Sequence, residues 1–104
     1  MTDFEWDPGK ESLNVEKHGV DFTTATQIWN GPLVDKIDAR RDYREIRIIA
    51  TGIAEGRLLV VVYTWRGERR RIISARKANS RERGRYEEEI AQRGRAAPDG
   101  LGAS

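Results

Sequence analysis

The stretch RLLVVVYTWR at residues 57–66 decides the fold. β-Branched and aromatic residues dominate it, which is typical of β-strands. Within it, Leu58–Tyr63 is apolar at every position, so both faces of the strand are apolar. A strand buried on both faces lies inside a sheet rather than at its edge. We therefore expect a strand from Arg57 to Arg66 at the centre of a sheet, with helices covering one side.

Extended patterns flank this central strand on both sides. They fall at residues 33–37, 44–52 and 68–75. Glu55-Gly56 and Arg66-Gly67 are turn sequences typical of tight hairpins. The pattern predicts a four-stranded antiparallel meander, with successive strands paired.

Strict alternation in the last of these strands predicts which way its side chains point. Ile72 and Ser74 should face one side of the sheet, and Ile73 and Ala75 the other. Arg76 then emerges at the end of the strand.

Capping residues indicate two helices before the meander. Residues 4–6 are predicted to form a short strand, after which Asp7 and Pro8 are suited to start a helix that runs to about Lys17. Gly19 is suited to end it in the left-handed region. Apolar residues at three- and four-residue spacing predict a second helix from residue 24 to 30, capped by Asp21 or Thr23.

A third helix is predicted after the meander, over residues 81–92. Asn79 or Ser80 can cap it, and Glu82 stands at capping-box spacing from Asn79. Residues 94–104 contain Pro98 and three glycines and are expected to form a flexible tail. The fold class is therefore α+β: one domain over residues 1–93, with an antiparallel sheet of four to five strands, two N-terminal helices and one C-terminal helix.

Composition excludes several classes of function. The chain has no cysteine and one histidine, which rules out disulfides, zinc-thiolate sites and a multi-histidine metal site within one chain. We predict no metal and no cofactor. The longest apolar run, Leu58–Tyr63, is too short to cross a bilayer, and the N-terminus lacks the basic start of a signal peptide. We expect a cytoplasmic protein without membrane contact.

Positive charge is concentrated in the second half of the chain. Residues 1–38 carry three Lys and eight Asp or Glu, whereas residues 39–104 carry 16 Lys or Arg and nine Asp or Glu. Residues 66–85 alone hold nine basic and two acidic side chains. Such a block attracts a polyanion through counterion release. A solvated basic surface or an acidic protein partner would also fit this charge.

The familiar catalytic motifs are missing, and arginine and lysine are the remaining candidates for chemistry. One reaction that needs little beyond positive charge and geometry is RNA cleavage by its own 2′-OH, which attacks the adjacent phosphate. Arginine suits this reaction because its planar fork can hold two phosphate oxygens at once.

Three separated blocks of the sequence resemble the BrnT toxin family. The first runs from FEWDP (residues 4–8) to KHGV (residues 17–20), the second is GRLLVVVYT (residues 56–64), and the third is RIISARKA (residues 71–78), followed by Glu82 and Tyr86. The resemblance covers residues 4–88, weakens over residues 33–46 and does not reach the tail. It implies a RelE-like fold and a type II toxin that cleaves RNA and inhibits translation. It also implies neutralisation by a cognate BrnA-like antitoxin, a ribbon-helix-helix DNA-binding protein that would reach operator DNA itself and form a hetero-oligomer with the toxin.

The resemblance places the family's toxicity residues at Lys17, Arg66, Arg76 and Tyr86. We hypothesise that the first three converge on one phosphate. Proton transfer would be assisted by Tyr86, or by His18, which follows Lys17 in the chain. Arg76 is the strongest candidate, because it follows a central strand and precedes a helix N-terminus that attracts phosphate.

Each of the other four residues has a structural alternative. His18 can cap the first helix, and Lys17 can be a cation favoured at the helix end. Arg66 can be an exposed hairpin charge, and Tyr86 can be a core residue rather than a surface on which bases stack. Four further arginines are interpreted as RNA-backbone contacts or solvated charge: Arg69, Arg70, Arg83 and Arg85.

Two rival functions remain open. The chain could be a basic module that binds nucleic acid or a partner without cleaving it. It could also be a toxin that has decayed, or one that needs the ribosome to position its mRNA. Cleavage assays on free RNA and in a translating extract separate these possibilities.

Overall fold

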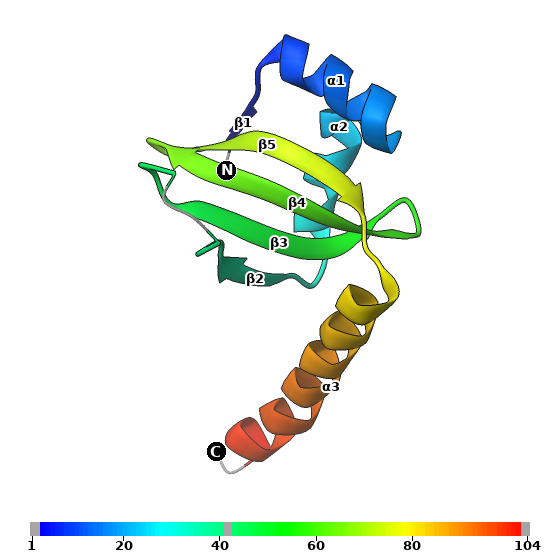
Figure 1. Cartoon of the computed structure of the whole chain (residues 1–104). Helices are drawn as coiled ribbons and strands as arrows, with labels where there is room; N and C mark the ends of the chain where they lie inside the picture. Colours follow the sequence, from blue (N-terminus) through cyan, green and yellow to red (C-terminus); the bar gives the residue numbers. More distant parts are fainter. Residues whose placement is uncertain (1–2, 41–42, 103–104) are drawn as a thin grey trace.

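A five-stranded sheet forms the centre of the computed structural model, which describes residues 3–40 and 43–102, the last eight by backbone alone (Figure 1). The strands lie in the order β1-β5-β4-β3-β2. In chain order the elements are β1 (Asp3–Glu5), α1 (Pro8–His18), α2 (Phe22–Ala25), the 3-10 helix η1 (Thr26–Asn30), β2 (Val34–Ile37), β3 (Arg47–Ala54), β4 (Arg57–Arg66), β5 (Arg69–Lys77) and α3 (Ser80–Gly102).

The predicted meander is confirmed, and β4 lies at its centre. Strands β2 to β5 pair in sequence and antiparallel. The turns between them use glycine at positive φ, 75° at Gly56 and 60° at Gly67. The sheet nevertheless differs from the expected wholly antiparallel one, because β1 pairs parallel with β5, with Phe4 opposite Arg70. A strand of three residues carries no pattern that reveals a partner so distant in the chain.

Local capping starts and ends α1 as predicted. The Asp7 carboxylate accepts a hydrogen bond from the Lys10 backbone N–H at 3.2 Å, and Gly19 ends the helix at φ 70°. The two apolar residues of the helix, Leu13 and Val15, are both exposed. The buried Asn14 side chain hydrogen-bonds to β5, so α1 is attached to the sheet by an amide rather than by an apolar stripe.

The core lies between one face of the sheet and the segment that contains α2 and η1. The expected helix over residues 24–30 is divided into these two pieces, and Asp21 caps the first by accepting from the Thr24 N–H at 2.6 Å. Phe22 and Ile28 are fully buried against the sheet. A Cβ at Gly52 of β3 would lie 2.9 Å from the Ile28 Cβ, so this glycine permits η1 to pack on the strand.

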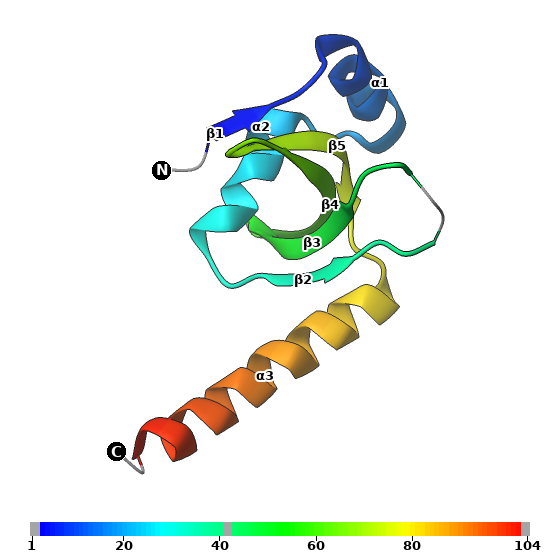
Figure 2. The same cartoon turned by 90° about the vertical axis from the view of Figure 1, so that its left-hand side faces the viewer.

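Helix α3 lies on the other face of the sheet, so the expectation of helices on one side only is wrong. Figure 2 shows the strands curving around α2 and η1, with α3 outside the sheet and next to β2. The helix continues to Gly102, ten residues beyond its predicted end at Gln92, and passes through Pro98 and Gly100, two residue types that disfavour a helix interior. Ala103 and Ser104 of the expected tail lie outside the described residues, and the division at residue 93 stays a prediction. None of the helices described is long and apolar enough to cross a membrane.

Candidate functional site

A β-bulge in β5 aims Arg76 at the face of the sheet opposite the core. Tyr63 pairs with Ile72, but Val62 pairs with Ser74, so Ile73 is an extra residue in β5. The bulge reverses the alternation that follows it. Ile72 and Ala75 consequently both lie in the core, which contradicts the prediction that they face opposite sides. Ser74 and Arg76 are turned together to the outer face.

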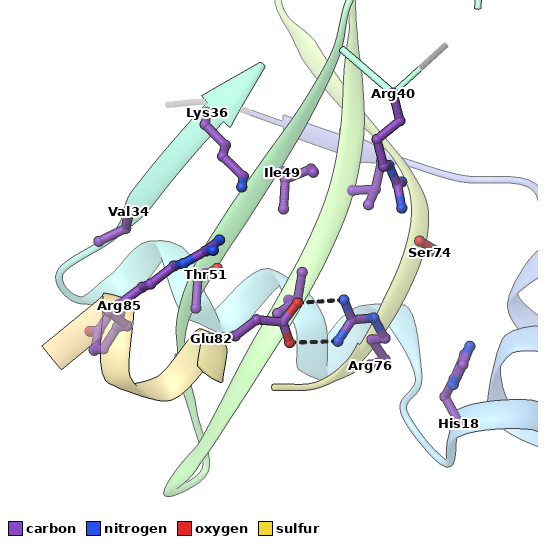
Figure 3. A pocket seen from close by; sticks show the side chains of 13 residues that line it. His18, Val34, Lys36, Arg40, Ile49, Thr51, Ser74, Arg76, Glu82 and Arg85 are labelled. Carbon is purple, nitrogen blue, oxygen red and sulfur yellow. Dashed lines mark hydrogen bonds and ion pairs between the residues drawn. The ribbon is translucent and has the colours of Figure 1, made fainter. Parts of the chain in front are cut away.

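Arg76 lines a pocket of about 450 Å³ between this outer face and the start of α3 (Figure 3). We call it the Arg76 pocket. Its floor is apolar and comes from β3 and β4, and its walls are polar. The lining residues are His18, Val34, Lys36, Arg40, Ile49, Thr51, Val60, Val62, Ser74, Arg76, Glu82, Arg85 and Tyr86.

Arg76 is held by a two-point ion pair with Glu82. The two guanidinium nitrogens lie 2.8 and 2.7 Å from the two carboxylate oxygens. This pairing lowers the pKa of Glu82 to about 2 and raises the pKa of Arg76. Glu82 also accepts from the Asn79 N–H at 2.9 Å, while Asn79 Oδ1 accepts from the Glu82 N–H at 2.8 Å. The predicted capping box is confirmed, and the ion pair with Arg76 joins the start of α3 to the end of β5.

Three more cations line the same pocket as Arg76: Lys36, Arg40 and Arg85. Arg40 is oriented by the buried Asp38, whose carboxylate accepts from its Nε and Nη2, both at 2.8 Å. The Arg40 guanidinium lowers the pKa of Asp38 well below its usual range. Sequence reasoning missed Lys36 and Arg40, and it treated Glu82 only as a capping residue. Alternation along β2 could have placed Lys36 on the outer face once the sheet was oriented.

His18 reaches the pocket from the last turn of α1. Its position follows from Asn14, one turn earlier on the same helix face. The Asn14 amide nitrogen donates to Ala75 O at 2.8 Å, and its oxygen accepts from Ala75 N at 3.1 Å. These bonds hold α1 against the residue that precedes Arg76. Gly19 N–H bonds to Val15 O at 2.8 Å, so this backbone group caps the helix. In the part of the chain that the structure describes, the imidazole itself makes no hydrogen bond.

Lys17 lies beside the Arg76 pocket rather than in it. It lines a smaller hollow of about 220 Å³ between α1 and β5, which shares His18 and Ser74 with the larger pocket. A bound polyanion that extends from one cavity to the other would contact Lys17 next to His18. The structure brings Lys17 near the site but not into its centre.

Arg66 does not converge with Arg76, contrary to the hypothesis. Arg66 pairs with Arg69 at the hairpin end, whereas Arg76 pairs with Val60. At about 3.3 Å per residue along β4, these two positions are about 20 Å apart. They are on the same outer face of the sheet, because Val60, Val62 and Arg66 alternate along one strand. Arg66 and Arg76 could therefore contact one extended strand at different points, but not one phosphate.

Tyr86 is buried, with 7% of its surface exposed. Its hydroxyl donates to Pro32 O at 3.0 Å, and burial raises its pKa. The ring lines the pocket wall and ties α3 to the chain just before β2. The core alternative fits these contacts, and the hydroxyl is poorly suited to proton transfer.

The four arginines assigned to RNA contact separate into three kinds. Arg85 lines the pocket, and Arg69 and Arg83 are exposed on the surface. Arg70 packs on the core side, where its guanidinium carbon lies 4.6 Å from the Trp65 ring and 4.8 Å from the Trp29 ring. Its Nε is buried and lacks a hydrogen-bond partner among the described residues. Arg70 is a packing residue, so its assignment to RNA contact does not fit its position.

The family is shown by comparison of the whole sequence. The family model described as "Ribonuclease toxin, BrnT, of type II toxin-antitoxin system" matches residues 6–82. This chain belongs to the BrnT family. The predicted membership and the predicted ribonuclease class are confirmed. A ribonuclease implies an RNA substrate, and a type II system implies a protein antitoxin as partner.

A solved BrnT structure has the same fold. The crystal structure of the Brucella abortus ribonuclease toxin BrnT shares 24% of its sequence with this chain and superposes with a TM-score of 0.58. The match covers 77% of this chain and 100% of the Brucella chain. The predicted α+β class is thereby confirmed. No curated protein sequence matches the chain.

Proposed function

We propose that the Arg76 pocket cleaves RNA through attack of the 2′-OH on the adjacent phosphate, without a metal ion, and that the cleavage inhibits translation in the cytoplasm. The observation that carries this proposal is the position of Arg76: its guanidinium is held in two-point geometry in a pocket that three further cations line. Such an arrangement suits a phosphate that gains negative charge in the transition state. The proposed substrate is RNA rather than DNA, because only RNA has the 2′-OH.

Charge in the pocket supports a reaction without metal. Of the residues that line it, Lys36, Arg40, Arg76 and Arg85 are cationic, and Glu82 alone is a carboxylate. A divalent cation prefers several oxygen ligands, whereas this lining repels positive charge and attracts phosphate. Arginine can supply the stabilising charge that a metal ion supplies in other nucleases.

The remaining cations are proposed to hold the RNA on either side of the reacting phosphate. Arg66 and Arg69 share the outer face with Arg76 and lie farther along the sheet, and Lys17 lines the adjoining hollow. Backbone contacts of this kind add affinity without selecting sequence. Arg66 and Lys17 thus contribute to toxicity by positioning RNA, while Arg76 contacts the reacting phosphate.

Purified protein should cleave single-stranded RNA equally well with and without EDTA. The 2′-OH attack predicts fragments that end in a 2′,3′-cyclic phosphate and fragments that begin with a 5′-OH, which mass spectrometry distinguishes. Complete loss of cleavage in EDTA would contradict a metal-independent reaction. RNA that is bound but left intact, both free and as mRNA in a translating extract, would instead support the basic binding module.

We infer that the antitoxin is a BrnA-like ribbon-helix-helix protein that forms a hetero-oligomer with this chain and alone contacts operator DNA. Membership of the BrnT family supports this partner. Coexpression of the protein encoded beside this gene should restore growth and copurify with the toxin. A neighbouring protein of another fold, or one that leaves growth arrested, would contradict the inference.

A further inference from the structure

We propose that Glu82 is the general base for this cleavage and that His18 is its general acid, on opposite sides of Arg76. This proposal rests on the proposed ribonuclease function and assigns the proton transfers within it. In Figure 3 the Arg76 guanidinium lies between the Glu82 carboxylate and the His18 imidazole. A phosphate bound to Arg76 would have one group on each side.

In-line cleavage needs two such groups. The attacking 2′-oxygen and the leaving 5′-oxygen lie on opposite sides of the phosphorus, so the proton acceptor and the proton donor must also lie apart. Glu82 takes the proton as the 2′-O–H bond breaks and the bond from the 2′-oxygen to phosphorus forms. The bond from phosphorus to the 5′-oxygen then breaks, and that oxygen receives a proton from the His18 imidazolium. The products are a 2′,3′-cyclic phosphate and a free 5′-OH.

Among the side chains that line the pocket, Glu82 and His18 are the two suited to these transfers. The Tyr86 hydroxyl already donates its hydrogen bond to Pro32 O. The remaining charged lining groups, Lys36, Arg40, Arg76 and Arg85, are cations that favour an ionised carboxylate. The other is His18, and histidine is the side chain that most often serves as a general acid or base in enzymes.

The ion pair with Arg76 does not prevent Glu82 from acting as a base. In the free protein the carboxylate is paired at both oxygens, which makes it weakly basic. An RNA phosphate competes for the same guanidinium. Because the phosphate takes up part of this charge, the pKa of Glu82 rises when substrate binds, and the base is activated only where RNA is present.

Both groups are held in place by bonds that do not involve RNA. Asn14 holds α1, and with it His18, against Ala75. The capping box with Asn79 holds Glu82. Their separation is thus set by the fold, as an acid and base pair requires.

Glu82→Gln tests the base with little change in structure. Glutamine is accepted in a capping box, and its amide oxygen can still accept from Arg76. We expect kcat on a single-stranded oligoribonucleotide to fall at least about 100-fold, within the range typical of general acid–base catalysis. We expect binding of the same oligomer with 2′-deoxy sugars, which cannot be cleaved, to stay equal or to strengthen.

The pH profile distinguishes a base from a residue that only positions Arg76. The wild type should show a bell-shaped profile, in which the acid limb reflects protonation of the Glu82 base and the alkaline limb reflects loss of the proton that the general acid donates. Glu82→Gln should lack the acid limb, and His18→Gln should lack the alkaline limb. Glu89→Gln removes an exposed carboxylate on the same helix and should cleave within about twofold of wild type.

Two results would overturn the assignment in different ways. If Glu82→Gln cleaves within about threefold of wild type and keeps the acid limb, Glu82 is not the base, while the ribonuclease function stands. If the wild-type protein cleaves neither free RNA nor mRNA in a translating extract, the proposed function fails, and the assignment fails with it.

Discussion

Arg76→Ala is expected to reduce RNA cleavage about 10³-fold and to abolish growth arrest, the largest functional effect of any single substitution in the chain. Removal of one preorganised donor to a developing oxyanion typically costs a factor of 10² to 10³. Here the substitution also leaves the Glu82 carboxylate without its partner, facing the phosphate site. Initial rates on labelled RNA and growth after induction measure the two effects.

The fold and antitoxin binding should survive this substitution, because the Arg76 side chain is 40% exposed and its loss opens no core cavity. Arg76→Lys keeps the charge but not the two-point fork, so we expect partial activity. Arg81→Ala, which removes an exposed arginine on α3 that does not line the pocket, is the matched control and should remain toxic. Unaltered growth arrest in Arg76→Ala would remove the central residue of the proposed site.

The double variant Arg76→Ala with Glu82→Gln separates the two causes of that loss. If repulsion by the unpaired carboxylate weakens RNA binding, the second substitution restores affinity measured with 2′-deoxy oligomers. It cannot restore cleavage, since it provides neither the guanidinium nor a base.

Local signals explain why so much of the sheet and of α1 was predicted correctly. The bounds of β4 agree residue by residue with the expectation, since a run that is apolar on both faces has few other structures available. Asp7 and Gly19 act through hydrogen bonds within one helical turn, and Pro8 acts through its fixed φ. A signal that is complete within a few residues can be read without knowledge of the fold.

Distant contacts explain what was missed. The alternating sequence pattern does not reveal that Ile73 is an extra residue in β5. This bulge nevertheless turns the Arg76 side chain toward the pocket. The packing of Arg70 depends on Trp29, which lies far away in the chain. The family resemblance placed Arg66 and Arg76 in one site, but strand pairing separates them by about 20 Å. The resemblance and residue type therefore identified several members of the site, while their arrangement required the register of the sheet.

Asn14→Ala is expected to lower the free energy of unfolding by about 3 kcal/mol, the largest loss of stability that we predict. Its buried amide donates to Val20 O and Ala75 O and accepts from Ala75 N, and each buried group left without a partner costs about 1–3 kcal/mol. Urea denaturation measures the loss. Leu13→Ala, which removes an exposed side chain, should change the free energy of unfolding by less than about 0.5 kcal/mol. Since Asn14 also fixes α1 beside Arg76, cleavage at a temperature where the variant is folded should fall while RNA binding holds. Equal stability of the variant and wild type would mean that α1 is attached to the sheet by contacts other than this amide.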